Sequence, residues 1–387
     1  MKKIVALLLC AAALISVFAG CRDKNEIPPS GGISAGSSPA ANEQVSETPP
    51  ASDPAADSPK AGTDVVDYNA AFAAFAPDAV MMNVGSYSVT WEELFFFIHK
   101  GIVGYDVTSW SDSSPNGEPW PEAILKYATT EIQKYKAIMH GTSTAGIALT
   151  DEEMASLEQD FEQEAVTYGG VEEYLKLFWE YDAIRSKSLY FYLVSTGRLY
   201  SKYLDFQYGE NASKITDSAV SEYASKNGYL MAKHILRKSD DESADAAALE
   251  LIEHVKDLLD SYKGNDLGGY FDELMRGFTE DSLDMFPDGY LFQPKDMVEP
   301  FSNACLALEI GEYSDIVKSQ FGYHIIYRLP IDLDAVPIAN ANSGITLRAS
   351  VAIDLFSATL KAWVESLPIK TTPEMDSMDM TEVFKIK

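Results

Sequence analysis

Residues 230–236 read LMAKHIL and residues 323–328 read YHIIYR. Both stretches are short, apolar and rich in residues that favour extended backbone, so each predicts a β-strand. Each strand also carries one histidine. Because side chains alternate between the two faces of a strand, His234 and His324 share a face with apolar neighbours. A histidine in such a place is ordinarily a packed core residue, so the pair alone does not define a site.

The block between residues 230 and 330 contains six short motifs in order. They are AKHIL at 232–236, FDELM at 271–275, FTEDS at 278–282, MVEPF at 297–301, LALEIGE at 306–312 and QFGYHII at 320–326. Residues 245–259 predict an amphipathic helix, because Ile252, Val255 and Leu259 recur at helical spacing. In this order and spacing the motifs closely resemble the parvulin family of peptidyl-prolyl cis–trans isomerases, over roughly a quarter of the chain.

The resemblance implies an α+β fold, with a four-stranded antiparallel sheet and helices packed around it. We expect this parvulin domain to span residues 230–330 and to be inserted in a helical, chaperone-like domain. That domain would be formed by residues 67–229 and by a C-terminal helix and tail at 331–387. The helix-rich sequence before the block and the single helix after it resemble, more weakly, the chaperone part of PrsA-like foldase lipoproteins.

The resemblance also implies which residues form the site. His234 and His324 would be the dual-histidine core of the family, which organises hydrogen bonds beneath the isomerising amide. Asp281 stands where parvulins carry Cys or Asp facing that bond. Three apolar residues would form the pocket for the proline ring: Met297, Phe301 and Phe321. Without the resemblance, the histidines are core residues and Asp281, beside Thr279 and Ser282, is a turn residue.

These residue types suit the isomerisation of an X–Pro peptide bond. Rotation about that bond faces a barrier of about 18–20 kcal/mol, because the C–N bond is partly double. Lowering this barrier requires no nucleophile, metal or cofactor, and we expect none. The site must hold the proline ring, exclude water and favour the twisted amide. An apolar pocket beside a few hydrogen-bonding groups meets these requirements.

One stretch departs from the family pattern. Many parvulins have Gly-Gly-Asp-Leu-Gly before the Met-x-x-x-Phe segment, whereas residues 287–292 read PDGYLF here, so Gly289 replaces a leucine that often lines the site. Residues 266–271, DLGGYF, look similar to that turn but lie before Asp281, and we interpret them as a connection between two helices. We expect the departure to affect the proline pocket and the rate rather than the fold.

A second departure concerns charge. Phosphate-directed parvulins use a basic cluster after the first histidine strand. Here Arg237 and Lys238 are followed at once by SDDE at 239–242. The sequence therefore argues against a preference for phosphorylated substrates. We interpret this acidic run, like Glu92 and Glu93 upstream, as a solvated turn or helix face.

The sequence before the block is rich in helical patterns. Residues 80–89 predict a hairpin and residues 98–118 a loop. Capping-box patterns begin helices at Thr90 and at Thr150. Helical periodicity predicts further helices at 121–140, 151–168, 171–179, 181–206 and 216–226, and one after the block at 347–367. The last residues, 368–387, look like an extended tail.

Residues 1–20 have the organisation of a bacterial lipoprotein signal peptide. Lys2 and Lys3 precede an uncharged run, and the sequence FAG ahead of Cys21 resembles a lipobox, so Cys21 is the predicted lipid-attachment site after cleavage. A plain secretory signal or an uncleaved anchor is the alternative. Residues 21–66 are rich in Pro, Ser and Ala and contain no aromatic residue, which predicts a disordered tether.

The composition excludes several classes of function. The 387 residues include 59 Asp and Glu against 30 Lys and Arg, a formal net charge of −29 that repels nucleic acid. The same charge disfavours electrostatic adhesion to anionic lipid, so membrane attachment must be covalent or hydrophobic. The three cysteines, Cys10, Cys21 and Cys305, are too few and too scattered for a disulfide framework or a zinc site.

Two functions are consistent with these features. The first is a peptidyl-prolyl isomerase that acts as an extracytoplasmic foldase, anchored through Cys21 and acting on unfolded exported polypeptides with X–Pro bonds. The second is a holdase chaperone with a weak or inactive parvulin domain, whose aromatic-rich helix at 181–206 would bind unfolded chains where it is exposed. A solute-binding lipoprotein would show alternating strands and helices, which the helix-rich front half lacks. The oligomeric state, a dimer included, stays open.

Overall fold

The computed structural model of the protein describes residues 66–239, 242–282 and 286–386. The predicted signal peptide, the lipid-attachment residue Cys21 and the predicted tether as far as residue 65 lie outside the described residues, as does part of the acidic run at 239–242. Within the described ranges, no helix combines the length and the apolar character needed to cross a membrane.

The described chain forms two units. The first consists of residues 66–210 and 353–386, and the second of residues 211–352. The second unit is therefore inserted between two segments of the first. This arrangement confirms the predicted α+β fold, in which a helical region built from both ends of the chain carries an inserted domain. The inserted unit is longer at both ends than the range 230–330.

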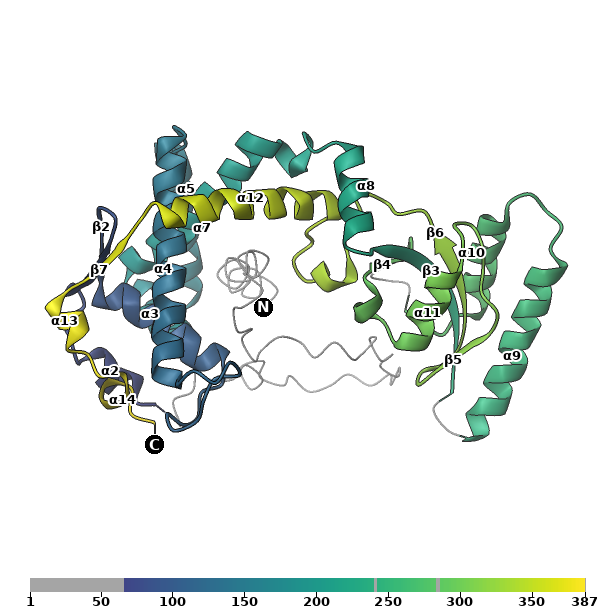
Figure 1. The fold of residues 1–387 in the computed structure, drawn as a ribbon, viewed down its shortest axis with the longest axis horizontal. Coiled ribbons are helices and arrows are strands. Elements are labelled where there is room, and N and C mark those ends of the chain that lie inside the picture. Colours follow the sequence, from purple (N-terminus) through teal and green to yellow (C-terminus); the bar gives the residue numbers. More distant parts are fainter. Residues whose placement is uncertain (1–65, 240–241, 283–285, 387) are drawn as a thin grey trace. The chain divides into compact units, whose positions relative to one another are not determined.

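The first unit is mainly helical (Figure 1). Its helices are α2 (Tyr68–Phe72), α3 (Trp91–Gly104), α4 (Trp120–Thr144), α5 (Asp151–Thr167), α6 (Val171–Asp182), α7 (Lys187–Tyr208), most of α12 (Leu347–Glu365), α13 (Pro373–Asp376) and α14 (Met380–Val383). Its strands are β1 (Val80–Val84), β2 (Tyr87–Thr90) and β7 (Ile369–Thr371).

The three strands of the first unit form a sheet in the order β2-β1-β7. The predicted hairpin at 80–89 is confirmed, and Gly85 in its turn has a φ of 59°, which glycine adopts at little cost. The prediction of an extended tail at 368–387 is wrong. This segment supplies β7 to the edge of β1 that the hairpin leaves unpaired, and Met375 and Phe384 bury their side chains in the core.

The two capping-box patterns have different outcomes. At Thr150 the box is complete: the hydroxyl accepts from the N–H of Glu153 at 3.2 Å, and the Glu153 carboxylate accepts from the N–H of Thr150 at 2.7 Å. At Thr90 the hydroxyl accepts from the N–H of Glu93 at 3.4 Å. The Glu93 side chain, however, turns into the core, where its carboxylate lies 2.9 Å from Lys136 Nζ. The interpretation of Glu93 as a solvated residue is therefore wrong.

Helix α3 is longer than predicted and continues to Gly104, so residues 98–104 are helical rather than part of a loop. The continuation buries Ile98 and Ile102, which lie one turn apart on the same face.

The close approach of α12 to α4 depends on Gly141 in α4. A Cβ at Gly141 would lie 2.2 Å from the ring of Trp363 in α12, so a residue with a side chain does not fit there.

The aromatic residues of α7 belong to the core of the first unit. Tyr190 and Tyr200 are buried, and Phe191 and Tyr203 are partly buried against the same core. Tyr200 meets Phe356 of α12 edge-on, with ring centroids 5.1 Å apart. For these residues the interpretation as core packing is confirmed.

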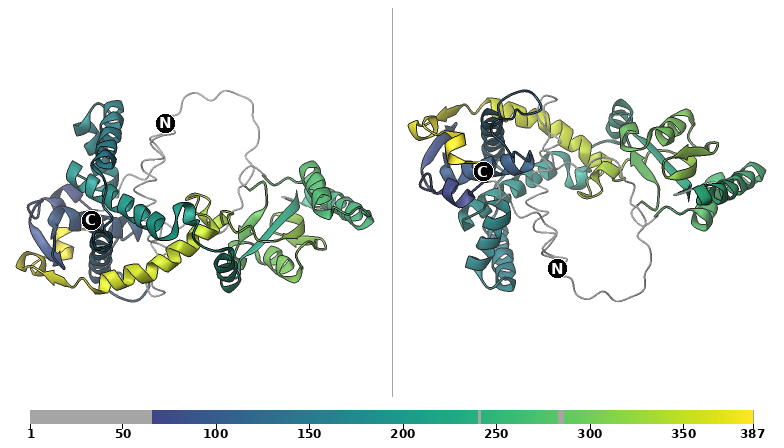
Figure 2. Two further views of the ribbon diagram at one scale, coloured as in Figure 1. Left: turned by 90° about the horizontal axis from the view of Figure 1, so that it is seen from above. Right: turned by 90° about the horizontal axis from the view of Figure 1, so that it is seen from below.

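The second unit consists of a sheet and the helices around it (Figure 2). Its strands are β3 (Leu230–Lys238), β4 (Tyr290–Phe292), β5 (Val317–Ser319) and β6 (Gly322–Leu329). Its helices are α8 (Asp217–Lys226), α9 (Glu242–Ser261), α10 (Leu267–Phe278) and α11 (Glu299–Ala307), with short 3-10 turns η2 (Pro294–Asp296) and η3 (Ile338–Asn340), while η1 (Glu210–Ala212) lies at the boundary of the units.

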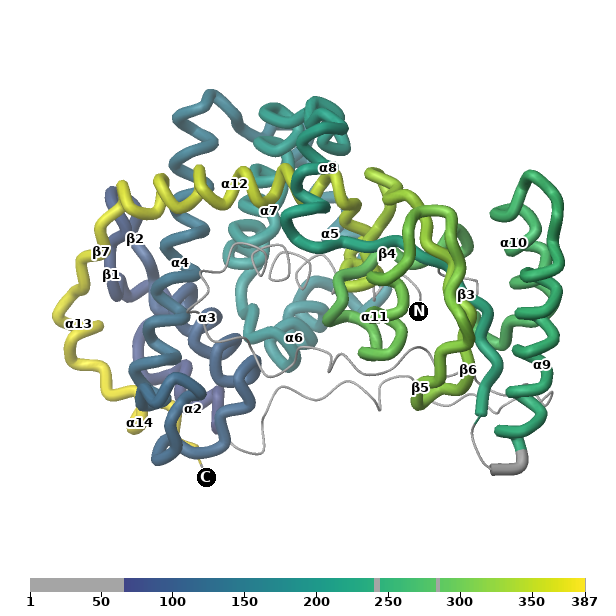
Figure 3. The backbone as a smooth tube through the Cα atoms, turned by 45° about the vertical axis from the view of Figure 1, so that its right-hand side comes forward, coloured from purple at the N-terminus to yellow at the C-terminus, as the bar shows by residue number. Residues whose placement is uncertain are grey.

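The sheet has the order β4-β3-β6-β5, and every pair is antiparallel. The predicted four-stranded antiparallel sheet is thus confirmed. One of its faces packs against α9 and α10 through residues such as Ile235 and Ile325. The opposite face packs against α11 through Ala232 and Ile326. Figure 3 shows α9 and α11 on the two sides of β3 and β6.

Residues 266–271 lie at the start of α10 rather than forming a whole connection. Asp266 is the N-cap of α10, and its carboxylate accepts from the N–H of Gly269 at 2.8 Å. The connection between α9 and α10 therefore ends at Asp266. The interpretation of all of residues 266–271 as a connection between two helices is wrong.

Arg348 explains why the second unit extends beyond the block. Its guanidinium donates to the carbonyl of Ile215 at 2.7 Å and lies 2.8 Å from the carboxylate of Asp217, just before and at the start of α8. It also forms an ion pair with Asp334 at 2.6 Å. The Arg348 side chain is only 12% exposed, so these bonds tie α8 to the chain that follows β6.

Candidate active site

The antiparallel register of β3 and β6 brings the two predicted histidines together. His234 lies opposite Ile326, and Leu236 lies opposite His324, so the histidines are diagonal neighbours on the sheet face that α11 covers. Their Nδ1 atoms are 3.0 Å apart and their rings are nearly parallel, at 16°. Both are buried, with 7% and 3% of their surface exposed, so each ring nitrogen needs a partner.

Asp281 supplies the partner of His234 on the side away from His324. Its Oδ2 lies 2.7 Å from His234 Nε2. The turn after α10 holds this carboxylate in place, because the Thr279 hydroxyl accepts from the backbone N–H groups of both Leu236 and Asp281, at 3.1 and 3.3 Å. The three residues predicted to form the polar part of the site therefore meet. Their catalytic role stays a prediction.

Tyr290 is a member of the site that was not predicted. Its hydroxyl donates to Asp281 Oδ2 at 2.6 Å, and its ring meets the ring of His234 edge-on at 5.6 Å. Pairing of β4 with β3 places Tyr290 opposite Ala232, one step along the same face from His234. The only signal in the sequence was that Tyr290 stands in the departure from the family pattern at 287–292.

Ser319 is the second unpredicted member. Its Oγ lies 2.7 Å from His324 Nε2 and also accepts from the N–H of Phe321 at 3.0 Å. Ser319 is the last residue of β5, and His324 lies on the neighbouring strand β6. Five side chains thus form one continuous hydrogen-bonded chain, in the order Ser319, His324, His234, Asp281 and Tyr290, which we call the polar network.

The distances constrain the positions of the protons. Because an ionised carboxylate only accepts, His234 donates to Asp281 from Nε2. With a neutral His234, its Nδ1 accepts from Nδ1–H of His324, and His324 Nε2 accepts from the Ser319 hydroxyl. This assignment satisfies every bond with both histidines neutral. A second proton on His234 would reverse the direction of the bonds to His324 and Ser319.

Burial and neighbouring groups act on the charges of the network. Burial, with a smaller contribution from His234, lowers the pKa of His324 to about 3, so His324 is neutral at neutral pH. Burial raises the pKa of Asp281, but the hydrogen bond and charge of His234 and the hydrogen bond from Tyr290 outweigh it, and that pKa lies below its usual value. Burial and the bond to Asp281 raise the pKa of Tyr290 well above its usual value.

An apolar cluster lies beside the polar network. Phe301 of α11 is buried and meets His234 and His324 edge-on, with ring centroids 5.2 and 5.8 Å away. Met297 packs, partly buried, against the same cluster. Phe321 contacts the polar network through its backbone N–H, which donates to Ser319 Oγ. The arrangement thus places an apolar surface next to hydrogen-bonding groups; its use as a proline pocket stays a prediction.

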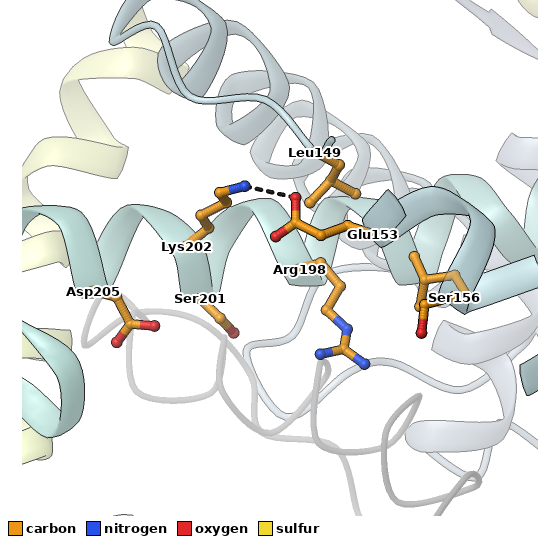
Figure 4. Close-up of a pocket in the computed structure, with 8 residues that line it drawn as sticks. Leu149, Glu153, Ser156, Arg198, Ser201, Lys202 and Asp205 are labelled. Carbon is orange, nitrogen blue, oxygen red and sulfur yellow. Dashed lines mark hydrogen bonds and ion pairs between the residues drawn. The ribbon is translucent and has the colours of Figure 1, made fainter. Parts of the chain in front are cut away.

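Two hollows are lined by residues of the first unit. One has a volume of about 250 Å³, lies between α5 and α7, and is lined by residues that include Glu153, Arg198 and Lys202 (Figure 4). The Lys202 amino group is paired with Glu153 at 2.6 Å across it. Among residues 66–239, 242–282 and 286–386, no group of three or more His, Cys, Asp or Glu side chains is placed to hold a metal ion.

Comparison with known proteins shows what this chain is similar to. Residues 234–329 match the model of the rotamase family, described as a PPIC-type PPIASE domain. The chain is 29% identical over 176 residues to foldase protein PrsA of Clostridium tetani (strain Massachusetts / E88), a match that covers 41% of this chain and 46% of that protein. It is 36% identical over 119 residues to foldase protein PrsA of Bacillus subtilis (strain 168), covering 29% of this chain and 35% of that one.

Each match therefore spans less than half the length of the relative. Among solved structures, the crystal structure of PrsA from Bacillus subtilis is 18% identical, with a TM-score of 0.26, and the match covers 79% of this chain and 94% of that one. Residues 234–329 are a PPIC-type parvulin rotamase domain, carried by a chain that is similar to foldase proteins named PrsA.

Proposed function

We propose that this protein is a peptidyl-prolyl cis–trans isomerase that acts as a foldase on exported polypeptides. The observation that carries the proposal is the juxtaposition of the polar network with the apolar cluster around Phe301, inside the domain that matches the rotamase family. His234, Asp281 and His324 are the proposed catalytic residues. Met297, Phe301 and Phe321 are the proposed pocket for the proline ring.

The geometry suits rotation about an amide bond. In the planar amide, resonance places partial negative charge on the carbonyl oxygen, and twisting the bond reduces it. A carboxylate held near that oxygen disfavours the planar form more than the twisted one, which is the role we propose for Asp281. His234 holds Asp281 in place through a bond of 2.7 Å, and His324 in turn holds His234 through a bond of 3.0 Å, while the ring of Phe301 excludes water from one side.

The substrate we propose is an unfolded polypeptide with an X–Pro bond that is not preceded by a phosphorylated residue. Of the two basic residues that end β3, Arg237 and Lys238, Arg237 is already engaged. It forms an ion pair with Glu280 at 3.0 Å and donates to the carbonyl of Phe278 at 2.9 Å. A phosphate would have to compete with both partners, which supports the proposal of unmodified substrates.

We further propose that the protein works outside the cytoplasm, attached to the membrane by a lipid on Cys21. The support is the sequence of residues 1–21, together with similarity to proteins named foldase PrsA. Membrane fractionation and intact-mass measurement of the wild type and of Cys21→Ser test this part. A wild-type mass without acyl groups would contradict it.

The enzymatic part is tested by the isomerisation rate of an X–Pro peptide. We expect the purified full-length protein to accelerate isomerisation, and His234→Ala and Asp281→Ala each to lose about tenfold or more of that activity. His254→Ala is the matched control, because His254 is an exposed histidine of α9 in the same unit, and it should retain full activity. A wild-type rate equal to the uncatalysed rate would exclude the enzymatic function.

A holdase is the second candidate, and one feature of the first unit favours it. A hollow of about 480 Å³ has a lining that includes Phe72, Phe75, Pro77, Glu92 and Arg185. Such a surface suits an apolar side chain of an unfolded polypeptide. A holdase would suppress aggregation of an unfolded client equally well as wild type and as His234→Ala. Loss of this effect in the variant would contradict it.

A further inference from the structure

Tyr290 is one of the two members of the polar network that the family motifs do not explain, and the one that contacts Asp281. Its hydroxyl and His234 Nε2 both donate to the same oxygen of Asp281, at 2.6 and 2.7 Å. Asp281 is therefore held between two donors from two different strands. A carboxylate with two donors on one oxygen cannot rotate away without losing both bonds.

The backbone conformation at Gly289 positions the Tyr290 side chain. Gly289, the preceding residue, has a φ of 108°, and a Cβ there would lie 2.9 Å from the carbonyl oxygen of Ala232. Only glycine fits this conformation and this close approach, so the turn can enter β4 directly opposite β3. Tyr290 is then paired with Ala232, and its ring is held by Phe286 at 5.2 Å and by His234 at 5.6 Å.

We propose that Tyr290 is a positioning residue of the isomerase site, which fixes the Asp281 carboxylate and thereby keeps the proton of His234 on Nε2. This inference rests on the proposed isomerase function. Without the hydroxyl, Asp281 would keep one donor and could turn about its side-chain bonds. His234 would then lose the acceptor that determines its tautomer, and the bonds to His324 and Ser319 would no longer have a single direction.

Two titratable side chains, His234 and Tyr290, donate hydrogen bonds to the Asp281 carboxylate. From β3 Asp281 faces His234, from β4 it faces Tyr290, and His324 on β6 lies behind His234. The neighbouring Glu280 is turned towards Arg237, to which it is paired at 3.0 Å. The raised pKa of Tyr290 keeps its hydroxyl protonated, and thus a donor, over the whole neutral range.

The variant Tyr290→Phe tests the inference, because it removes only the hydroxyl and keeps the ring contacts. The matched control is Tyr313→Phe, which removes a tyrosine hydroxyl that donates to another carboxylate of the same unit, Asp260, at 2.8 Å. We expect Tyr290→Phe to lower kcat/KM about tenfold, mainly through kcat, and to move the acidic limb of the pH–rate profile to higher pH. Tyr313→Phe should change neither quantity.

Two further measurements separate a positioning role from a purely structural one. In the background of Asp281→Asn, the added Tyr290→Phe substitution should have little further effect, because the tyrosine acts through the carboxylate. Nuclear magnetic resonance of the full chain should show a higher pKa for Asp281 and altered imidazole 15N shifts for His234 in Tyr290→Phe. These signals do not depend on activity, so they test the inference even if the wild type proves inactive and the proposed function fails.

An unchanged pH–rate profile together with unchanged Asp281 and His234 signals in Tyr290→Phe would overturn the inference. Equal losses of kcat/KM in the wild-type and Asp281→Asn backgrounds would overturn it as well, because the tyrosine would then act independently of the carboxylate.

Discussion

The two units bury polar side chains in opposite ways. In the first unit, Glu93 and Lys136 form an ion pair of 2.9 Å in which both residues are at most 6% exposed. The Lys136 amino group also lies 4.1 Å from the centre of the Tyr192 ring, so the pair is enclosed by aromatic core. In the second unit, the polar network runs through two buried histidines and Asp281 and ends at two partly exposed residues, Ser319 and Tyr290.

This difference shows what burial of a polar group indicates about function. A buried charge is tolerated in either place because it is paired and hydrogen-bonded. The pair in the first unit is closed, because both of its residues are buried. The polar network instead connects its buried histidines to two partly exposed residues, Ser319 and Tyr290. Burial alone therefore does not identify a site, and the feature that distinguishes the polar network is its connection to partly exposed residues.

The buried histidines of the two units also differ, in their hydrogen bonds. His99 of α3 is 1% exposed, and its ring lies 4.5 Å from that of Tyr68. Its Nδ1 has no hydrogen-bond partner among the residues that the structure describes. His324 is equally buried, yet both of its ring nitrogens are hydrogen-bonded. We infer that His99 is a packing residue and that His324 belongs to a site.

Breaking the closed pair should produce the largest effect. Lys136→Met leaves the Glu93 carboxylate buried without its counter-charge, and we expect it to lower the free energy of unfolding of the first unit by about 3–5 kcal/mol. Urea denaturation followed by tryptophan fluorescence measures this, because all five tryptophans of the chain lie in the first unit.

Two control variants sharpen that experiment. The double variant Glu93→Leu/Lys136→Met removes both charges and should recover most of the lost stability. Lys176→Met breaks an exposed pair of the same unit and should leave the stability nearly unchanged. If Lys136→Met alone destabilised the protein by less than about 1 kcal/mol, the pair would not be a structural requirement of the first unit.

The buried histidine of the first unit should make stability depend on pH. Burial, with a smaller contribution from Lys100, lowers the pKa of folded His99 to about 3, whereas an unfolded histidine titrates near pH 6.5. Between these values the unfolded state binds more protons. The free energy of unfolding should therefore fall as the pH decreases from about 6.5 towards 3, by up to about 1.4 kcal/mol per pH unit for this residue.

The variant His99→Phe isolates this contribution. Burial raises the pKa of Glu92 and Glu93, which act in the opposite direction at lower pH, so the informative quantity is the difference between the wild type and the variant. We expect the tryptophan-monitored stability of His99→Phe to depend less steeply on pH between 5 and 7, with isomerase activity unchanged. Identical slopes for the two proteins would contradict the assignment of a neutral, buried His99.

The smallest effect is expected at the far end of the polar network. Ser319→Ala leaves His324 Nε2 without its hydrogen bond, which should cost about 1 kcal/mol of stability and lower isomerase activity by up to about fivefold. Ser314→Ala is the matched control: its hydroxyl accepts from the N–H of Ile326 at 2.9 Å, so its loss should affect stability without affecting activity. Equal activities of the two variants would argue that the network does not extend to Ser319.

Patterns between near neighbours in the chain predicted local structure well. The hairpin at 80–89, the capping box at Thr150 and the strand around His234 are confirmed because turns, caps and alternation depend on residues a few positions apart. The same reasoning was incomplete at Thr90. The spacing of Thr90 and Glu93 fits a capping box whether the glutamate faces water or core, and Lys136, 43 residues away, decides which.

The candidate site was predicted only in part for a similar reason. The resemblance identified His234, Asp281 and His324, and the structure brings them together. It did not identify Tyr290 or Ser319, because single polar residues at the ends of short strands have no periodic signature. Their contribution depends on how β4 and β5 pair with the central strands.

By itself, the sequence determined the hairpin at 80–89, many of the helices, the order of the motifs and the pair of histidine strands, since these follow from neighbours along the chain. Only the tertiary structure decided that Glu93 is buried, that residues 368–386 complete the sheet of the first unit, and that Tyr290 meets Asp281. Those contacts depend on the register of paired strands and on the packing of helices, which bring together side chains that no local pattern relates.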